Sequence, residues 1–283
     1  MKSLADGYKL SNGVEVPCVG FGTWQTPDGE DCIFRVKTAI EAGYRHIDSA
    51  QRYENEESVG EAIRQSGIAR DEIFVTTKLA NPEHGYDKTM AAFQLSLEKF
   101  KMDYVDLFLI HWPNPVDFRD NWQEANAGSW KAFEELYKAE KIRAIGISNF
   151  RKHHIDALMQ TAEITPMVHQ MHLCPGDTQE ELSEYSRSLG MLLEAYTPLG
   201  SGAIFDVPEM KQFAEKYNKS IAQICLKWSI QQGYVPLTRS GNATRIKDNV
   251  DIFDFELEEK DVQFIAGLEG CIGLSVDPDT IKF

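Results

Sequence analysis

Residues 105–110 read Val-Asp-Leu-Phe-Leu-Ile, a run that is apolar apart from Asp106 and is followed by the histidine His111. A run this short cannot span a bilayer and is typical of a strand buried inside a globular protein. In barrels of parallel strands, the residues that do chemistry follow the carboxyl ends of the strands. His111, directly after this run, is therefore a candidate for chemistry.

The same unit recurs along the chain, as short β-branched runs separated by longer amphipathic stretches. Strands are expected at 19–21, 46–48, 73–77, 105–110, 144–147, 168–170, 192–196 and 234–237. Helices are expected at 31–42, 56–65, 89–100, 129–139, 153–160, 179–189, 221–232 and 258–267. Strands near 8–10 and 14–16, around Asn12-Gly13, predict an N-terminal β-hairpin.

This rhythm predicts one α/β domain over residues 1–283, a (β/α)8 TIM barrel with an N-terminal hairpin. The rival fold is a doubly wound sheet with a glycine-rich dinucleotide turn after its first strand. Gly20-Phe21-Gly22 lacks the third glycine and the helix start of that turn, which favours the barrel. The sequence shows no coiled-coil pattern and no obvious segment for self-association, so we expect a monomer.

The charge and the N-terminal sequence exclude several classes of partner. A net charge of −15 at pH 7 argues against nucleic acid or an anionic membrane. The first ten residues contain no continuous apolar stretch, so neither a signal peptide nor a membrane anchor is expected. We therefore expect a cytoplasmic location.

The cysteines and histidines predict no metal site. The five cysteines include no C-x-x-C pair, and buried thiols are expected rather than a disulfide framework or a zinc site. His153, His154 and His169 have no acidic or cysteine partner at metal-ligand spacing in the sequence.

Four polar side chains fall at or after the ends of predicted strands: Asp48, Tyr53, Lys78 and His111. A carbonyl accepts hydride readily only if its oxygen gains a proton as negative charge develops. A tyrosine can give that proton, and a nearby ammonium lowers its pKa from about 10. Lys78 would supply the ammonium, Asp48 would hold it, and His111 would orient the carbonyl.

Five stretches closely resemble the signature of the aldo-keto reductase family. They are GYRHIDSA (43–50), YENE (53–56), FVTTK (74–78), DYVDLFLIHWP (103–113) and IGISNF (145–150). The resemblance implies that Asp48, Tyr53, Lys78 and His111 are the catalytic tetrad, with Tyr53 as the general acid. It also implies a nicotinamide cofactor bound without a Rossmann fold.

The resemblance further implies a set of cofactor-binding residues. Ser148, Asn149 and Gln170 would bind the carboxamide, and Tyr196 would stack on the nicotinamide ring. The pyrophosphate would run along Leu199, Gly200 and Ser201, the 2′-phosphate would meet Arg239, Ser240 and Arg245, and the adenine would meet Asn249. This set favours NADP(H) over NAD(H).

The chain departs from the family pattern at two places. Arg239 stands where a lysine is usual, although a guanidinium can still bind a phosphate in bidentate fashion. After Gln170 the family often has an apolar residue, Glu, an aromatic residue, His and Pro. Here the order is Met171-His172-Leu173-Cys174-Pro175, and none of these positions belongs to the tetrad.

Three tryptophans are expected to line an apolar substrate site: Trp24, Trp112 and Trp122, the last in a loop from Pro113 to Gly128. The short tail from Gly270 to Phe283 is similar to that of bacterial family members that act on small carbonyl compounds. Candidate substrates are small aldehydes, ketones, dicarbonyls and keto-sugars, and the residues do not choose among them.

Other interpretations remain open. The chain could be a non-catalytic sensor of nicotinamide cofactors, since some family members are regulatory subunits of channels. It could be an aldolase using Lys78 as a Schiff-base amine, although that chemistry favours a lysine without a carboxylate partner. Ser148-Asn149 could instead be the N-cap of the following helix, and Asp48 a plain salt-bridge partner.

Overall fold

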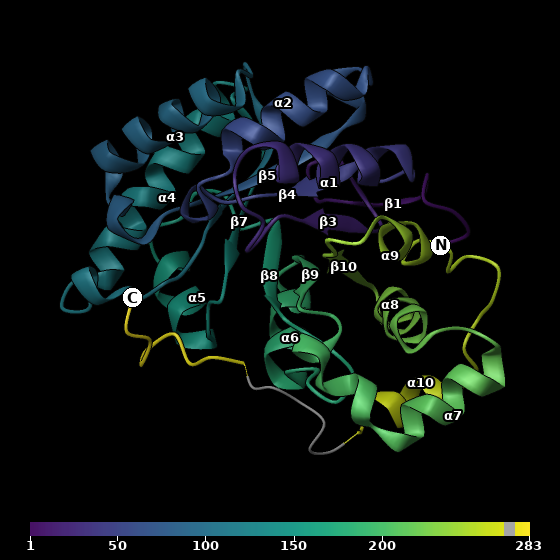
Figure 1. The fold of residues 1–283 in the computed structure, drawn as a ribbon. Helices are drawn as coiled ribbons and strands as arrows, with labels where there is room; N and C mark the ends of the chain where they lie inside the picture. The colour runs from purple at the N-terminus through teal and green to yellow at the C-terminus, as the bar shows by residue number, and fades with distance from the viewer. Residues whose placement is uncertain (269–274) are drawn as a thin grey trace.

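The computed structural model describes residues 1–268 and 275–283, and its centre is a closed barrel of parallel strands (Figure 1). Around the barrel the strands follow the order β10-β3-β4-β5-β6-β7-β8-β9. They are β3 (Gly20–Gly22), β4 (His46–Asp48), β5 (Phe74–Leu79), β6 (Val105–Ile110), β7 (Ile142–Ser148), β8 (Val168–His172), β9 (Leu192–Tyr196) and β10 (Tyr234–Thr238). The (β/α)8 barrel predicted from the sequence is confirmed.

Helices surround the barrel, and short 3-10 turns lie in several of the connections (Figure 1). The α-helices are α1 (Glu30–Glu41), α2 (Glu56–Ser66), α3 (Tyr86–Phe100), α4 (Trp122–Lys138), α5 (Lys152–Met159), α6 (Glu180–Ser188), α7 (Pro208–Tyr217), α8 (Ile221–Gln231), α9 (Ala243–Asp248) and α10 (Glu259–Ala266). The 3-10 turns are η1 (Gln51–Tyr53), η2 (Arg70–Glu72), η3 (Asn81–Glu83), η4 (Val116–Phe118) and η5 (Gly200–Asp206). Within the described residues, no helix is both long and apolar enough to cross a bilayer.

The predicted hairpin is present as a separate antiparallel pair, β1 (Gly7–Lys9) and β2 (Glu15–Pro17). Gly13 closes its turn with a φ of 89°, a conformation that glycine adopts without strain. The Tyr8 hydroxyl donates to the carbonyl of Tyr234, where β10 begins, and Asn12 donates to that of Arg143 in β7. The hairpin therefore lies at the amino-terminal end of the barrel, away from the strand ends that carry the site.

Strand β6 is buried along its whole length although it contains a charged residue. On its outer face the Phe108 ring stacks 4.3 Å from Phe133 of α4 and lies 5.1 Å from Phe93 of α3. The charged residue of this strand, Asp106, is also fully buried, and it accepts hydrogen bonds of 2.7 Å from both Arg70 and Arg143. The charge is tolerated because two cations balance it.

The structure corrects the expected loop from Pro113 to Gly128, because α4 begins at Trp122. The expected helix began at 129, directly after Gly128, although glycine only weakens a helix and does not have to end it. A Cβ on Gly128 would lie 3.1 Å from the Tyr86 nitrogen and 3.3 Å from the Gly85 Cα. Gly128 therefore allows α4 to pack closely against the start of α3 and does not end the helix.

Two further differences concern helix boundaries. Helix α5 has Arg151 as its N-cap, so Ser148 and Asn149 are not the capping residues. Helices α7 and α9 were not expected, although α7 carries the usual signal of a proline at its first position, Pro208.

Candidate active site

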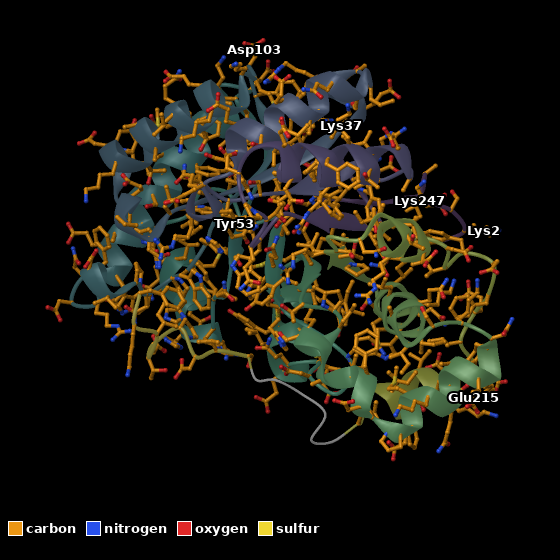
Figure 2. The ribbon with its side chains drawn as sticks, viewed as in Figure 1. Lys2, Lys37, Tyr53, Asp103, Glu215 and Lys247 are labelled. Atoms are coloured by element: carbon orange, nitrogen blue, oxygen red, sulfur yellow. The ribbon has the colours of Figure 1, made fainter. Side chains whose placement is uncertain are left out.

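Asp48, Tyr53, Lys78 and His111 lie together at the carboxyl-terminal end of the barrel. Asp48 is the last residue of β4, Lys78 is in β5, and His111 follows β6. Tyr53 ends η1, the turn that follows β4. Figure 2 shows Tyr53 toward the middle of the molecule. Because all of the barrel strands are parallel, these chain segments meet at one end.

The Lys78 ammonium is the centre of this group. It donates at 2.6 Å to Asp48 Oδ1, at 2.8 Å to the Ser49 carbonyl and at 3.4 Å to the Tyr53 hydroxyl. The Tyr53 and His111 rings meet edge to face, with centroids 5.8 Å apart. Lys78 is fully buried and Asp48 nearly so, whereas Tyr53 and His111 are half-buried. Of the three side chains joined by these hydrogen bonds, Tyr53 is thus the least buried.

The protonation states follow from burial and from this ion pair. Burial acts to lower the pKa of Lys78, but Asp48 and Tyr53 together raise it, so the amine stays charged. Burial, followed by the charge of Lys78, holds the pKa of His111 well below its usual value, so the imidazole is neutral. Burial raises the pKa of Tyr53, and the Lys78 ammonium only opposes that rise. The expectation that the ammonium brings this pKa below its usual value is therefore wrong.

Gln170 connects this group to a buried carboxyl that the sequence reading had passed over. The Gln170 amide nitrogen donates at 2.9 Å to Asp48 Oδ2 and at 2.9 Å to Oε2 of Glu194. Glu194 is in the middle of β9 and has no exposed surface. The available signal was a charged residue inside an otherwise apolar strand, which is rare without a reason.

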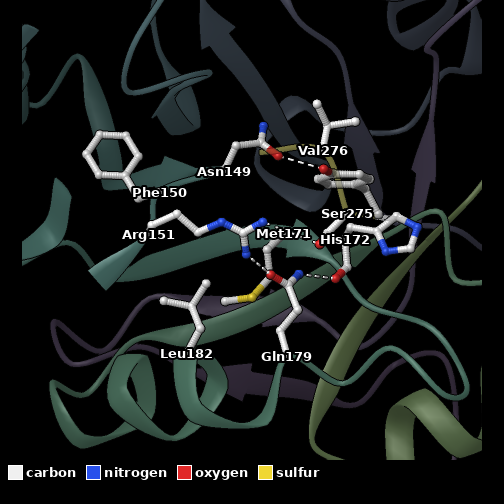
Figure 3. Close-up of a pocket in the computed structure, with 10 residues that line it drawn as sticks. Asn149, Phe150, Arg151, Met171, His172, Gln179, Leu182, Ser275 and Val276 are labelled. Carbon is white, nitrogen blue, oxygen red and sulfur yellow. Dashed lines mark hydrogen bonds between the residues drawn. The ribbon is translucent and has the colours of Figure 1, made fainter. Parts of the chain in front are cut away.

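Asn149 connects three strand ends near this group. Its backbone is in the left-handed region, with φ of 62°. Its amide nitrogen donates to the His111 carbonyl at 2.9 Å and to Ser148 Oγ at 3.1 Å, and its Oδ1 accepts from the Tyr196 hydroxyl at 2.6 Å. Asn149, His172 and Tyr196 line one pocket. Figure 3 shows Asn149 and His172 in that pocket, with a dashed line for the hydrogen bond that Asn149 Oδ1 accepts.

The residues expected at the phosphates and the adenine differ in exposure, and Gly200 is buried whereas Ser201 is exposed. Gly200 and Ser201 both have a φ of 54°, which interrupts η5 at its start, directly after Leu199. Arg239 is exposed and donates to the Trp24 carbonyl at 3.2 Å. Arg245 in α9 is also exposed, and its side chain has no hydrogen bond or ion pair with any other described residue. Of the other two positions, Ser240 is half-buried and Asn249 is buried.

The three tryptophans lie in different settings. Trp24 is 50% exposed beneath the guanidinium of Arg239, which lies 5.6 Å from its ring centroid. Trp112 is half-buried next to His111 and meets the ring of Phe283 edge to face at 5.3 Å. Trp122 packs its ring against His154 of α5 at 4.8 Å. Their role in binding substrate stays a prediction.

The structure gives His153 and His154 an acidic neighbour that the sequence spacing did not indicate. Asp279 lies 3.1 Å from His153 Nε2 and 3.0 Å from His154 Nε2. The backbone N–H of Arg151 donates to His154 Nδ1 at 3.1 Å, so the proton of the neutral ring is on Nε2 and points to Asp279. Since Nε2 then has no free lone pair, the cluster is better explained as hydrogen bonding that anchors the C-terminal segment. His169, by contrast, pairs with Ser186 at 2.8 Å.

Comparison with known proteins places this geometry in a family. The glyoxal reductase of Bacillus subtilis strain 168 is 46% identical over 281 residues, which cover 99% of each chain. The methylglyoxal reductase DkgA of Escherichia coli K12 is 37% identical over 273 residues, 96% of each chain.

Solved structures agree. The aldo-keto reductase AKR2E4 of Bombyx mori, crystallised in complex with NADP, has a TM-score of 0.84 and 36% identity. The match covers 93% of this chain and 92% of that one. A family profile described as the Aldo/keto reductase family matches residues 18–269. The chain therefore belongs to the aldo/keto reductase family.

Proposed function

We propose that this protein is an NADP(H)-dependent carbonyl reductase in which Tyr53 is the general acid. The observation that carries the proposal is the 3.4 Å hydrogen bond from a buried, Asp48-paired ammonium to a half-buried phenol. The bound nicotinamide would supply the hydride. All of the proton chemistry would then fall to side chains of this chain.

Tyr53 is suited to give a proton to an oxygen that becomes an alkoxide. Its raised pKa keeps the hydroxyl protonated at neutral pH, and an alkoxide is a stronger base still. As the proton leaves, the Lys78 ammonium stabilises the phenolate at a distance already set by the fold. The neutral His111 ring beside Tyr53 can donate a hydrogen bond to the same carbonyl oxygen and orient it.

The donors and acceptors around Gln170 fit a primary carboxamide such as that of nicotinamide. Both hydrogens of the Gln170 amide are used by Asp48 and Glu194, which leaves its carbonyl oxygen as an acceptor. Ser148 Oγ accepts from Asn149, so its own hydrogen is left to donate. Ser148 and Gln170 are register partners on β7 and β8. Together they offer one donor and one acceptor, the complement of a carboxamide.

The other end of the cofactor would be held by Arg239, Ser240 and Arg245. Arg239 and Arg245 are both exposed, and with the Ser240 hydroxyl they would form a local cationic site in a chain of net charge −15. A 2′-phosphate would give Arg245 the partner that it does not have among the described residues. Asn249 would contact the adenine, Leu199, Gly200 and Ser201 the pyrophosphate, and Tyr196 the nicotinamide ring.

The substrates we propose are small aldehydes, ketones and dicarbonyls, with keto-sugars as a further class. Two full-length relatives are named for the reduction of glyoxal and methylglyoxal. Trp24 and Trp112 would form apolar walls on either side of the polar group, and Trp122 would add to them from α4. An aldolase using Lys78 is disfavoured, because its ammonium is held by three hydrogen bonds.

The test is a substrate panel with both cofactors. The purified protein is mixed with NADPH or NADH and then with glyoxal, methylglyoxal, a simple aldehyde or a keto-sugar, and absorbance at 340 nm is followed. We expect steady multiple turnover with NADPH and slower turnover with NADH. Tight NADPH binding without turnover on any member of the panel would indicate a cofactor sensor instead.

A further inference from the structure

Glu194 is a buried carboxyl that has no charged cation within 4.0 Å among the described residues. Its side chain has no exposed surface. Of the described residues, only His46 brings a basic nitrogen within 4.0 Å, with Nε2 at 3.9 Å from Oε1. Burial lowers the pKa of His46 to about 3, so that ring is neutral. An isolated buried carboxyl is costly, and a chain that keeps one inside its barrel has a use for it.

Among the described residues, the hydrogen bond that Glu194 accepts from Gln170 connects it directly to the tetrad. The Gln170 amide nitrogen has two hydrogens, one directed to Glu194 Oε2 and the other to Asp48 Oδ2, both at 2.9 Å. If the amide turned over, its carbonyl oxygen would face the Asp48 carboxylate, which can only accept, and Oε2 of Glu194 would lose the hydrogen that it accepts. Glu194 and Asp48 therefore fix which end of the Gln170 amide remains available.

We propose that Glu194 is a positioning residue for the reaction. By holding the second hydrogen of the Gln170 amide, it keeps the Gln170 carbonyl oxygen available to the nicotinamide carboxamide, whose NH2 group would donate a hydrogen bond to that oxygen. Glu194 itself touches neither the cofactor nor the substrate. This inference rests on the proposed function, because it assigns a task within the same site.

The charge state of Glu194 gives the proposal a second readout. Burial and then the charge of Asp48 raise the pKa of Glu194 to about 8, against the opposing hydrogen bond from Gln170. The ionisable groups that face it are Asp48 and His46 from β4 and Lys78 from β5; β8 presents Gln170, and β10 places Val235 beside it. Glu194 is therefore neutral at pH 7 and becomes anionic between pH 7 and 9. A new negative charge there favours the oxidised nicotinamide, whose ring is cationic, over the reduced form.

The first experiment measures cofactor affinity rather than turnover. Dissociation constants for NADP+ and for its 3-acetylpyridine analogue, in which a methyl group replaces the carboxamide NH2, are measured by quenching of tryptophan fluorescence. Wild type should bind the analogue about fivefold more weakly, the size of one uncharged hydrogen bond. In Glu194→Leu this ratio should fall to about one.

The matched control is Glu56→Leu. Glu56 is another buried carboxyl near the barrel, where it accepts from Thr77 at 2.7 Å, and it has no hydrogen bond or ion pair with Gln170 or Asp48. Its loss should perturb packing similarly yet keep the wild-type ratio. A folded Glu194→Leu that also keeps the wild-type ratio would overturn the proposal.

The second experiment uses Glu194→Gln, which keeps an acceptor for Gln170 and removes the ionisation. Wild type and Glu56→Gln should bind NADP+ about threefold more tightly, relative to NADPH, at pH 9 than at pH 7. Glu194→Gln should show no such shift and should keep the fivefold ratio. If circular dichroism shows that Glu194→Leu does not fold, the comparison of Glu194→Gln with wild type becomes the test. A pH-dependent change in the relative affinity for NADP+ and NADPH that persists in Glu194→Gln overturns the proposal. A wild type that binds neither form of the cofactor would instead refute the proposed function.

Discussion

The tetrad and the segment from Arg239 to Arg245, which runs into helix α9, are organised in opposite ways. In the tetrad, Lys78 has no exposed surface and makes three hydrogen bonds within the protein. In the segment, Arg239 and Arg245 are exposed, and the Arg245 side chain has no partner among the described residues.

The difference shows which side chains the fold holds in place before any ligand binds. Groups that would meet developing charge are already in place, which is how a site stabilises a transition state without reorganising. Groups that would meet a permanent phosphate are left solvated and ordered by the ligand itself. Changes in the first region should therefore alter rate, and changes in the second should alter affinity.

The largest effect should come from Tyr53→Phe. It removes the proton donor and leaves the ring, the Lys78–Asp48 pair and the fold in place. We expect kcat for methylglyoxal reduction to fall about 10³-fold, within the range of general-acid catalysis. The Kd for NADPH, measured by fluorescence, should stay within about twofold of wild type. Near-normal turnover would show that Tyr53 is not the acid.

Lys78→Met should break the tetrad through stability as well as rate. The change leaves the Asp48 carboxylate buried without the ammonium now 2.6 Å away. Removing one partner of a buried pair costs about 3–5 kcal/mol, which urea unfolding followed by circular dichroism would detect. The double variant Asp48→Leu with Lys78→Met should recover most of that stability and none of the turnover. If the single variant is as stable as wild type, the ion pair does not hold this region together.

Arg245→Ala should show the opposite pattern, with lost affinity and normal rate at saturation. A charge-assisted hydrogen bond to phosphate contributes about 1.5–3 kcal/mol, so the Kd for NADPH should rise roughly 10- to 100-fold. NADH has no 2′-phosphate and should bind as before. Lys247→Ala removes a nearby exposed cation from the same helix and serves as the control. Equal losses for NADPH and NADH would remove Arg245 from the phosphate site.

The smallest effect should come from Arg239→Lys. It keeps the charge and replaces the forked guanidinium, which in this structure also contacts the Trp24 carbonyl. We expect the Kd for NADPH to change by no more than about threefold, with unfolding unaffected. A loss as large as that of Arg245→Ala would mean that bidentate binding at this position dominates the preference for NADPH.

The sequence predicted the barrel well because its strands are buried on both faces. The expected bounds of β4, β6 and β9 match the structure, and the residues within those bounds are mostly buried. Helices α7 and α9 were not expected, and α9 spans too few residues to show a period. Helix α4 was expected too short, because a packing glycine resembles a helix breaker.

Within the site, the sequence could indicate which residues follow strand ends but not what lies beneath them. Glu194 was hidden within a strand whose other members are mostly apolar, and only the closed barrel brings it to Gln170. Asp279 reaches His153 and His154 from a distant part of the chain. The direction of the Tyr53 pKa also required the structure, because it depends on how far burial outweighs one ammonium.

Asn149 has a consequence for how the barrel mouth moves. A single amide joins the end of β7 to the residue after β6 and to the last residue of β9. A segment tied in this way cannot fray one strand at a time, so its backbone amides should exchange with deuterated solvent as one cooperative unit. Replacing Asn149 with glycine would suit the left-handed backbone yet divide that unit into independently breathing strands.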